Sequence, residues 1–394
     1  MNFDVNRLAM LEAVKNVDKV APSNSPVELL KGILIESNED TGEVYLTATN
    51  HEVSIQQKVM ATVTQSGEML INSRILLGMM SKMNQEFISI SADKPQVLKV
   101  TGGECKFHIN CHSPQSYPKP VMPFPGECVF ITGICSLAKR TVFAVSDDDT
   151  KPILQCVQVR LKNNALHAAA SDSMRMMLVR DSAEQAEEKE FLLRGRALQM
   201  LASISNDSDV FEVGDIGKAI AFVRGDMIFT INKINEGSYM NTAALVENIK
   251  PEYAAVADIG KMKEALSIVS VAASAGMVRQ PINIVFREGE IIVQCNSDVS
   301  NAHSVVPANV TKKTPGAGFY YDGLSLLKLF QILGGKVKLE IDAKGFLVVK
   351  TRNEAYFQSP VRKPIKKKDP EKQEKERAKG AKDVKETTET KGAA

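Results

Sequence analysis

Residues 2–20, NFDVNRLAMLEAVKNVDKV, combine a short strand-like segment with a helix-like one. In the second segment, apolar side chains recur about every three residues, at Leu8, Leu11, Val14 and Val17. This spacing predicts an amphipathic helix over residues 6–20, preceded by a short strand. The same order of strand and helix returns at residues 128–145 and at residues 253–273. The chain therefore contains three copies of one structural unit, with a period of roughly 120 residues.

Each copy continues with further strands and a second helix. Two strands with alternating apolar residues follow the first helix, at residues 32–36 and 44–47, 153–161 and 165–169, and 282–286 and 291–295. A second helix is predicted at residues 73–84, 197–205 and 324–333, and Ser73 and Asp322 stand where N-caps are expected. Two more strands close each copy, at residues 87–92 and 97–109, 210–213 and 219–231, and 337–341 and 346–351.

The boundaries between the copies are expected near residues 122 and 247. Prolines cluster at the first boundary, at Pro118, Pro120, Pro123 and Pro125, and Lys250-Pro251 lies just past the second. The predicted division is a domain at 1–122, a second at 123–247, a third at 248–362 and a tail at 363–394. Two helices and several strands per copy predict an α+β fold, with the helices packed on an antiparallel sheet. Two such chains joined head to tail would close a ring of six domains.

The composition is that of an ordinary folded protein, with 44% hydrophobic and 24% charged residues. From Lys363 onward the chain carries 11 Lys/Arg and 7 Asp/Glu, whereas the rest carries 38 and 40. The part of the chain before the tail is thus slightly acidic, which does not fit a protein that binds nucleic acid over its whole surface. The composition of the tail, rich in Lys and Glu, predicts disorder. A solubilising role and an electrostatic tether for DNA or a partner are both open for the tail.

The cysteines and the first residues bear on the compartment. Six cysteines are scattered without a CxxC pair, at Cys105, Cys111, Cys128, Cys135, Cys156 and Cys295. This pattern favours a reducing, cytoplasmic setting. The N-terminal stretch lacks the apolar core of a secretory signal, and no apolar run reaches the length of a membrane span.

Several segments resemble the beta subunit of bacterial DNA polymerase III, the sliding clamp family. Lys151-Pro152-Ile153-Leu154 is similar to the family's R-P-I-L strand start. Residues 170–176, ASDSMRM, resemble its A-T-D-G-x-R-L segment, and residues 46–50, LTATN, resemble L-x-A-T-D. Residues 356–362, YFQSPVR, resemble the closing Y-x-x-M-P-x-R. The resemblance covers roughly residues 1–362 and rests on the order and spacing of these motifs.

The resemblance implies a homodimeric sliding clamp, a replication processivity factor without catalytic activity or cofactor. Such a ring encircles double-stranded DNA without reading its sequence. A clamp loader opens it, and it tethers the catalytic subunit of DNA polymerase and repair proteins. Family partners insert a short peptide into a cleft between the second and third domains. Carried over by residue, this cleft consists of Leu154, Ser171, Ser173, Met174, Arg175, Met176, Met240, Ala244, Leu245, Phe357, Ser359, Pro360, Val361 and Arg362.

The chemistry of the cleft residues suits a peptide, because methionine side chains adapt to apolar anchors of several shapes. Ordinary core methionines are the alternative reading. The chain departs from the family pattern in the cleft at Ser173, Met240, Ala244 and Ser359, and in a loop at Asn24. These departures predict an altered partner preference. They also leave open a second hypothesis, a clamp-fold scaffold that binds proteins without serving replication.

Sliding on DNA favours non-specific contacts with phosphates over the reading of bases. The candidate DNA-facing residues are the basic side chains on the six repeat helices: Arg7, Lys15, Arg74, Lys82, Lys139, Arg140, Arg194, Arg196, Lys261, Lys263 and Lys328. A solvated helix surface is the alternative for each one. For the dimer seam, the resemblance implies that Phe107 and Ile109 of one chain meet Val271 and Ala272 of the other.

Three groups of residues resemble catalytic or metal sites in their residue types. Cys105, Cys111 and the histidines His108 and His112 suggest a zinc box, but on a strand the histidines point away from the cysteines. The acidic run at residues 147–149 fans out instead of converging on a metal. Gly102-Gly103 predicts a turn, not a phosphate loop. We therefore expect no metal site, and an enzyme with an unrecognised site stays the third hypothesis.

Overall fold

The structure is a computed structural model that describes residues 1–183, 188–234, 237–247, 249–276, 279–297 and 299–363. The chain divides into two compact units. The first unit takes Met1–Lys250 together with Val348–Gln358, and the second takes Pro251–Leu347 and the residues from Ser359. A late segment of the chain therefore returns to the first unit. The predicted division into three domains stays a prediction, and the tail beyond residue 363 lies outside the described residues.

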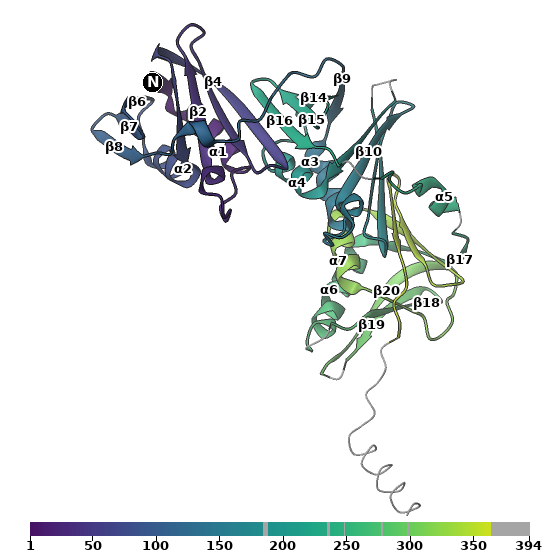
Figure 1. Cartoon of the computed structure of the whole chain (residues 1–394). Coiled ribbons are helices and arrows are strands. Elements are labelled where there is room, and N and C mark those ends of the chain that lie inside the picture. The colour runs from purple at the N-terminus through teal and green to yellow at the C-terminus, as the bar shows by residue number, and fades with distance from the viewer. Residues whose placement is uncertain (184–187, 235–236, 248, 277–278, 298, 364–394) are drawn as a thin grey trace, which may run out of the picture. The chain divides into compact units, whose positions relative to one another are not determined.

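The larger sheet of the first unit runs β8-β7-β6-β1-β4-β16-β15-β14-β9, with β2, β3 and β5 beside this path (Figure 1). The strands are β1 (Asn2–Asn6), β2 (Gly32–Asn38), β3 (Glu43–Thr49), β4 (Val53–Gln65), β5 (Gly67–Asn72), β6 (Phe87–Lys94), β7 (Val97–Gly102), β8 (Cys105–Asn110), β9 (Cys128–Thr132), β14 (Val210–Asp215), β15 (Ala219–Arg224) and β16 (Met227–Asn232). Strand β4 pairs along its length with β1, β3 and β16. This one long strand joins the first copy of the repeat to the second.

A second sheet of the first unit runs β13-β10-β11-β12-β24, all antiparallel. Its strands are β10 (Cys156–Lys162), β11 (Ala165–Ser171), β12 (Arg175–Ser182), β13 (Lys189–Arg194) and β24 (Glu354–Gln358). The short β23 (Leu347–Lys350) precedes β24. The pairing of β24 with β12 places Met176 directly opposite Phe357. These two residues, 181 positions apart in the chain, thereby share one face of a sheet.

The first unit contains two pairs of packed helices, α1 (Arg7–Asp18) with α2 (Ser73–Lys82), and α3 (Ile134–Thr141) with α4 (Gly195–Ser203). The short α5 (Thr242–Glu247) follows later in the chain. The prediction of Ser73 as an N-cap is wrong by one residue. The side chain of Asn72 accepts the hydrogen bonds from the amides of Arg74 and Ile75. Ser73 begins the helix and is buried, and its hydroxyl donates to Asp18 at 2.5 Å.

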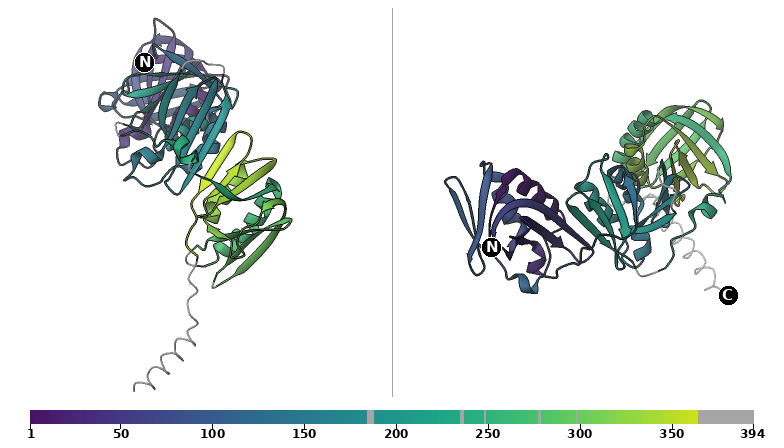
Figure 2. Two further views of the ribbon diagram at one scale, coloured as in Figure 1. Left: turned by 90° about the vertical axis from the view of Figure 1, so that its right-hand side faces the viewer. Right: turned by 90° about the horizontal axis from the view of Figure 1, so that it is seen from above.

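The second unit has the sheet order β22-β17-β20-β19-β18-β21. Its elements are β17 (Pro251–Asp258), α6 (Ile259–Ala273), β18 (Ile282–Arg287), β19 (Glu290–Asn296), β20 (Asn301–Lys312), β21 (Phe319–Tyr321), α7 (Gly323–Ile332) and β22 (Lys336–Asp342). Helices α6 and α7 pack together on one side of the sheet (Figure 2). Asp322 caps α7 as predicted, accepting from the amides of Leu324 and Ser325.

The α+β architecture and the repeated strand and helix order are confirmed, with two kinds of difference. The predicted strands at 97–109 and 219–231 are hairpins, because Gly103 and Gly225 adopt positive φ angles of 58° and 53° at their turns. Strands β4, β12, β20 and β24 and the short helix α5 were not predicted. In β4 (VSIQQKVMATVTQ) polar side chains interrupt the apolar alternation, so the pattern is weak although the strand is long. No helix of the described residues has the length and apolar character needed to span a membrane.

Candidate functional site

An apolar cluster lies on the face of the sheet where β12 meets β24. Met176, Val348 and Phe357 are buried in it. The partly buried side chains packed against them are Leu178, Met240, Val246, Ile249 and Ala355. The structure thus brings together three predicted cleft residues, Met176, Met240 and Phe357. The other members were missed. The alternation of Met176 and Leu178 on one strand face is the signal that would have found Leu178.

The turn between β11 and β12 carries the next group of predicted cleft residues. The Asp172 carboxylate accepts from the amides of Met174 and Arg175, each at 2.9 Å. The Ser171 hydroxyl donates to the Arg175 carbonyl at 2.7 Å and accepts from the Ser173 amide at 3.1 Å. This turn leaves the Met174 side chain 53% exposed at its tip. An exposed methionine held on a well-bonded turn is suited to contact with a partner.

Ser173 occupies a backbone conformation that favours glycine, with a φ of 77°. A side chain in the left-handed region costs roughly 1–2 kcal/mol relative to glycine, because Cβ approaches the following carbonyl. The hydrogen bonds that Ser171 and Asp172 accept from the amides of Ser173 and Met174 hold the turn in this conformation. The structure therefore gives a physical reason why the resembling family motif has a glycine at this position.

The remaining predicted cleft residues lie in three places. Leu154 is half-buried in a 3-10 turn, and its carbonyl accepts from the Ser146 amide at 2.9 Å. Leu245 is 45% exposed on α5. Ala244 also lies on α5, but its side chain is outside the described residues. Residues Ser359, Pro360, Val361 and Arg362 belong to the second unit, where the Val361 amide donates to the Tyr320 carbonyl at 2.8 Å.

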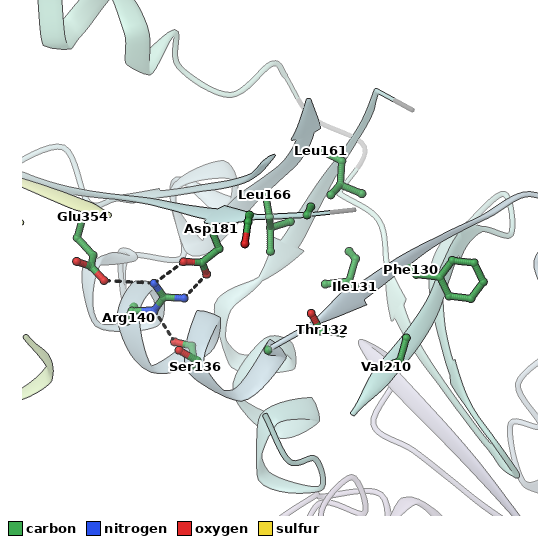
Figure 3. Close-up of a pocket in the computed structure, with 13 residues that line it drawn as sticks. Phe130, Ile131, Thr132, Ser136, Arg140, Leu161, Leu166, Asp181, Val210 and Glu354 are labelled. Atoms are coloured by element: carbon green, nitrogen blue, oxygen red, sulfur yellow. Dashed lines mark hydrogen bonds and ion pairs between the residues drawn. The ribbon is translucent and has the colours of Figure 1, made fainter. Parts of the chain in front are cut away.

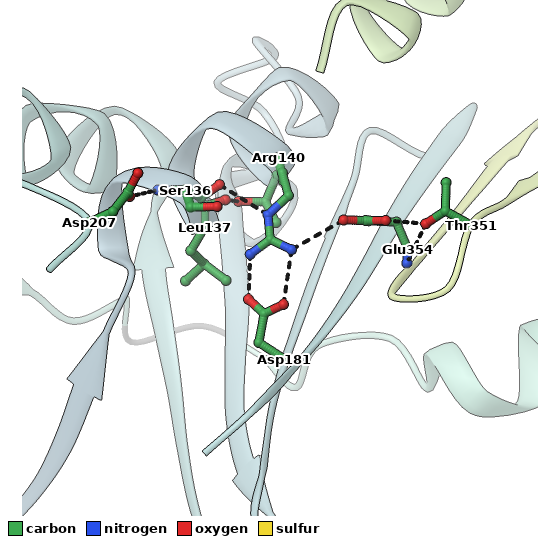
Figure 4. A network of polar contacts seen from close by, with 8 residues as sticks. Ser136, Leu137, Arg140, Asp181, Asp207, Thr351 and Glu354 are labelled. Carbon is green, nitrogen blue, oxygen red and sulfur yellow. Dashed lines mark hydrogen bonds and ion pairs between the residues drawn. The ribbon is translucent and has the colours of Figure 1, made fainter. Parts of the chain in front are cut away.

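Arg140 on α3 is engaged in a network of carboxylates (Figure 4). Its guanidinium pairs with both oxygens of Asp181 on β12 and, at 3.3 Å, with Glu354 on β24. The side chain is only 13% exposed. Burial alone would lower the pKa of this guanidinium, but Asp181 and Glu354 outweigh burial and raise it. These contacts favour a structural role for Arg140 over the predicted DNA contact.

A cavity of about 990 Å³ lies beside this network (Figure 3). Its apolar wall includes the half-exposed side chains of Phe130 and Val210, and its polar end is formed by Arg140 and Asp181. The polar groups at that end already bond one another. Among the described residues, no three His, Cys, Asp or Glu side chains are placed to hold a metal ion. The cavity thus offers apolar surface, and Arg140 and Asp181 at its charged end are engaged with one another.

The other predicted DNA-facing residues differ in whether their side chains are exposed or bonded to neighbouring groups. Eight are exposed on the helices: Lys15, Arg74, Lys82, Lys139, Arg196, Lys261, Lys263 and Lys328. Arg7 instead donates to the carbonyls of Gln85 and Met80, and so fastens the start of α1 to the end of α2. The Arg194 guanidinium lies 3.7 Å from the Glu52 carboxylate, within ion-pair distance. Each of the three helix pairs thus carries exposed basic side chains.

The residues predicted for the dimer seam are only partly available on the surface. Phe107 is half-buried and Ile109 is 8% exposed on the edge strand β8. On α6, Val271 is 73% exposed, but Ala272 is buried in its own unit. Adjacent helix residues point about 100° apart, so Val271 is the exposed member of the predicted pair. Ile268, one turn before Val271 and 50% exposed, is the better neighbour.

Comparisons with known proteins agree over most of the chain. The family model of the DNA polymerase III beta subunit, N-terminal domain, matches residues 1–123, and that of its central domain matches residues 132–240. The beta sliding clamp of Micrococcus luteus is 24% identical over 317 residues, covering 79% of this chain and all of that protein. The Bacillus subtilis beta sliding clamp is 23% identical over 259 residues, 62% of this chain and 68% of that protein.

Solved structures extend the likeness in fold to the second unit. The DNA polymerase sliding clamp of Bacillus subtilis superposes with a TM-score of 0.82 at 19% identity, covering 92% of this chain and 100% of that one. The DNA polymerase III beta subunit of Pseudomonas aeruginosa gives a TM-score of 0.81 at 18% identity, with the same coverage. With the matched domains and the three helix pairs in place, the chain belongs to the beta sliding clamp family of bacterial DNA polymerase III beta subunits.

Proposed function

We propose that this chain is a DNA sliding clamp that surrounds duplex DNA as a head-to-tail homodimer and has no catalytic activity. The observation that carries the proposal is the fold, in which each of three helix pairs presents exposed lysine or arginine. Long basic side chains on helices suit transient contacts with phosphates that do not fix a register on DNA. The three predicted domains, 1–122, 123–247 and 248–362, would supply half of a six-domain ring.

The test of encirclement is topological. The chain is loaded on a nicked circular plasmid with the clamp loader of its own organism and ATP, then separated by gel filtration. We expect co-elution with the circle and release when a restriction enzyme linearises it. Retention that survives linearisation would show simple surface binding, and would contradict a sliding ring.

We further propose that the cluster around Met176 and Phe357 is the anchor pocket of a partner-peptide cleft. The polymerase, the loader and repair proteins are the proposed partners. Ser171, Ser173, Met174, Arg175, Met240 and Leu245 support this cleft from the first unit, with Leu154, Ala244 and residues 359–362 as its proposed remainder. Packing of adaptable methionines around a buried aromatic ring suits apolar anchors of different shapes.

A charge placed at the cleft tests this proposal without disturbing the core. Met174→Asp changes a side chain that is 53% exposed, and Met60→Asp is the matched control at 60% exposed. We expect Met174→Asp to weaken binding of an apolar clamp-binding peptide at least tenfold in fluorescence anisotropy. Met60→Asp should bind like the parent. Equal affinities for all three proteins would place the cleft elsewhere.

A protein-binding scaffold that does not serve replication is the second candidate. The departures at Ser173, Met240, Ala244 and Ser359, together with Asn24, favour it. Such a scaffold would bind the apolar peptide but would not be retained on the circular plasmid. The two measurements above therefore separate the candidates.

A further inference from the structure

Three rows of side chains cross one face of the sheet β10-β11-β12-β24. Cross-strand pairing sets Ser171, Met176 and Phe357 in one row. The next row holds Gln158, Ala169, Leu178 and Ala355. The last row holds Arg160, His167 and Arg180. Directly opposite residues lie on the same face, so the apolar anchor pocket continues along the sheet into a basic row.

The floor between these rows is hollow. A cavity of about 300 Å³ is lined by Gln158, Arg160, His167, Ala169, Leu178 and Thr242, among others. Ala169 contributes little more than a methyl group, so the sheet surface is low at the middle of the hollow. Leu178 lines the hollow and also packs against the anchor pocket. The hollow and the apolar cluster therefore share Leu178 as a common wall.

The far end of the hollow is electropositive. Arg160 is held by Glu190 at 3.0 Å, which leaves it about half exposed. Arg180 is exposed, and among the described residues it has no carboxylate within ion-pair distance. Burial and the charges of Arg180 and Arg160 lower the pKa of His167, which agrees with two guanidinium groups lying close to the ring. An anion placed here would meet Arg180 and also Arg160, which Glu190 shares.

We propose that this hollow is an extension of the peptide cleft that takes an acidic side chain of the partner peptide. The inference rests on the proposed cleft and names the chemistry of its partners. Met176 and Arg180 are four residues apart on β12, roughly 13 Å at about 3.3 Å per residue. An extended peptide anchored at Met176 would therefore place a carboxylate at Arg180 three or four residues beyond its apolar anchor.

The test compares three labelled peptides in fluorescence anisotropy. One is an uncharged core with two leucines and a phenylalanine. The other two add a pair of glutamates four residues beyond the core, one on its N-terminal and one on its C-terminal side. We expect one extension, and only one, to tighten binding about fivefold, because exposed ion pairs contribute only modestly to affinity. The gain should shrink at high salt.

Charge reversal distinguishes direct contact from a structural effect. In Arg180→Glu the favoured glutamate extension should bind more weakly than the core, and a lysine extension should bind more tightly than the core. Arg287→Glu, an exposed strand arginine of the second unit, is the matched control and should keep the parent's preference.

The outcomes separate this inference from the proposed cleft. If the core peptide binds and neither glutamate extension adds affinity, or Arg180→Glu leaves the gain unchanged, the extension is refuted and the cleft stands. If core binding is absent or is insensitive to Met174→Asp, the cleft and the extension fail together.

Discussion

Helices α3 and α6 are the first helices of successive copies, yet their basic residues do different things. On α3, Arg140 is 13% exposed and pairs with Asp181 and Glu354. On α6, Lys261 and Lys263 are exposed near the start of the helix. The last turn of α3 lies against β12, where Asp181 pairs with Arg140, whereas Lys261 and Lys263 lie on the exposed side of the first turns of α6. The role of a basic side chain on these helices therefore depends on whether it lies against a strand that carries carboxylates.

The contrast assigns the chain's basic residues to two classes. Arg140 connects α3, β12 and β24, and β24 carries Phe357 into the proposed anchor pocket. The exposed lysines of α6 have no such partners among the described residues and are free to meet phosphates. Neighbouring Lys139 on α3 is also exposed, so both classes occur on one helix.

The largest expected effect comes from Arg140→Ala. It leaves the carboxylates of Asp181 and Glu354 without their partner in a partly buried place. We expect the free energy of unfolding to fall by about 3 kcal/mol, measured by urea denaturation. A loss under 0.5 kcal/mol would show that solvent replaces the guanidinium, and would remove the contrast with α6.

A smaller effect is expected from the double change Lys261→Glu and Lys263→Glu. Stability should hold, because acidic side chains are tolerated in the first turns of a helix. Affinity for a short DNA duplex should fall about tenfold at low salt, and the slope of log affinity against log salt should drop by about two. An unchanged slope would remove α6 from the DNA-facing set.

The variant Glu354→Gln tests whether the contact between Arg140 and Glu354 holds β24 in place. The variant keeps the shape of the side chain but loses its charge, while Asp181 still holds Arg140. We expect a loss of about 1 kcal/mol in unfolding free energy. Hydrogen exchange should speed up at the amides of β24 and remain as in the parent in β1. Uniform exchange changes along the chain would argue against a local role.

The smallest effect is expected from Lys139→Ala, which tests an exposed basic side chain on the same helix as Arg140. Its unfolding free energy should stay within about 0.5 kcal/mol of the parent, because an exposed lysine loses little on truncation. Duplex affinity should fall about twofold to threefold. A stability loss like that of Arg140→Ala would show that the two side chains were assigned the wrong way round.

Local spacing was enough to predict much of the fold. The helices of the three copies were found because their apolar residues recur every three or four positions, and Asp322 was found as a cap. The cap at Ser73 was wrong by one residue because Asn and Ser are both good N-caps, and the sequence does not say which has non-helical backbone. Strand β4 was missed because its polar side chains weaken the alternation.

The residues of the proposed cleft show which information is local in the sequence and which is not. The motif at residues 170–176 located Met174 and Met176, and the closing segment located Phe357. Their meeting depends on β24 pairing with β12, which no local pattern encodes. Val348, Val246 and Ile249 were missed for the same reason, since short apolar segments do not reveal which distant sheet they cover.

By itself, the sequence determined the threefold repeat, the helix faces and the resemblance that led to the family. These features depend on periodicity and on residues close together in the chain. Only the tertiary structure decided that Arg140 is held by two carboxylates, that Ala272 faces its own core and that a basic row shares a sheet face with Met176 and Phe357. Those facts depend on strand register and on helix orientation against a sheet, which long-range packing sets.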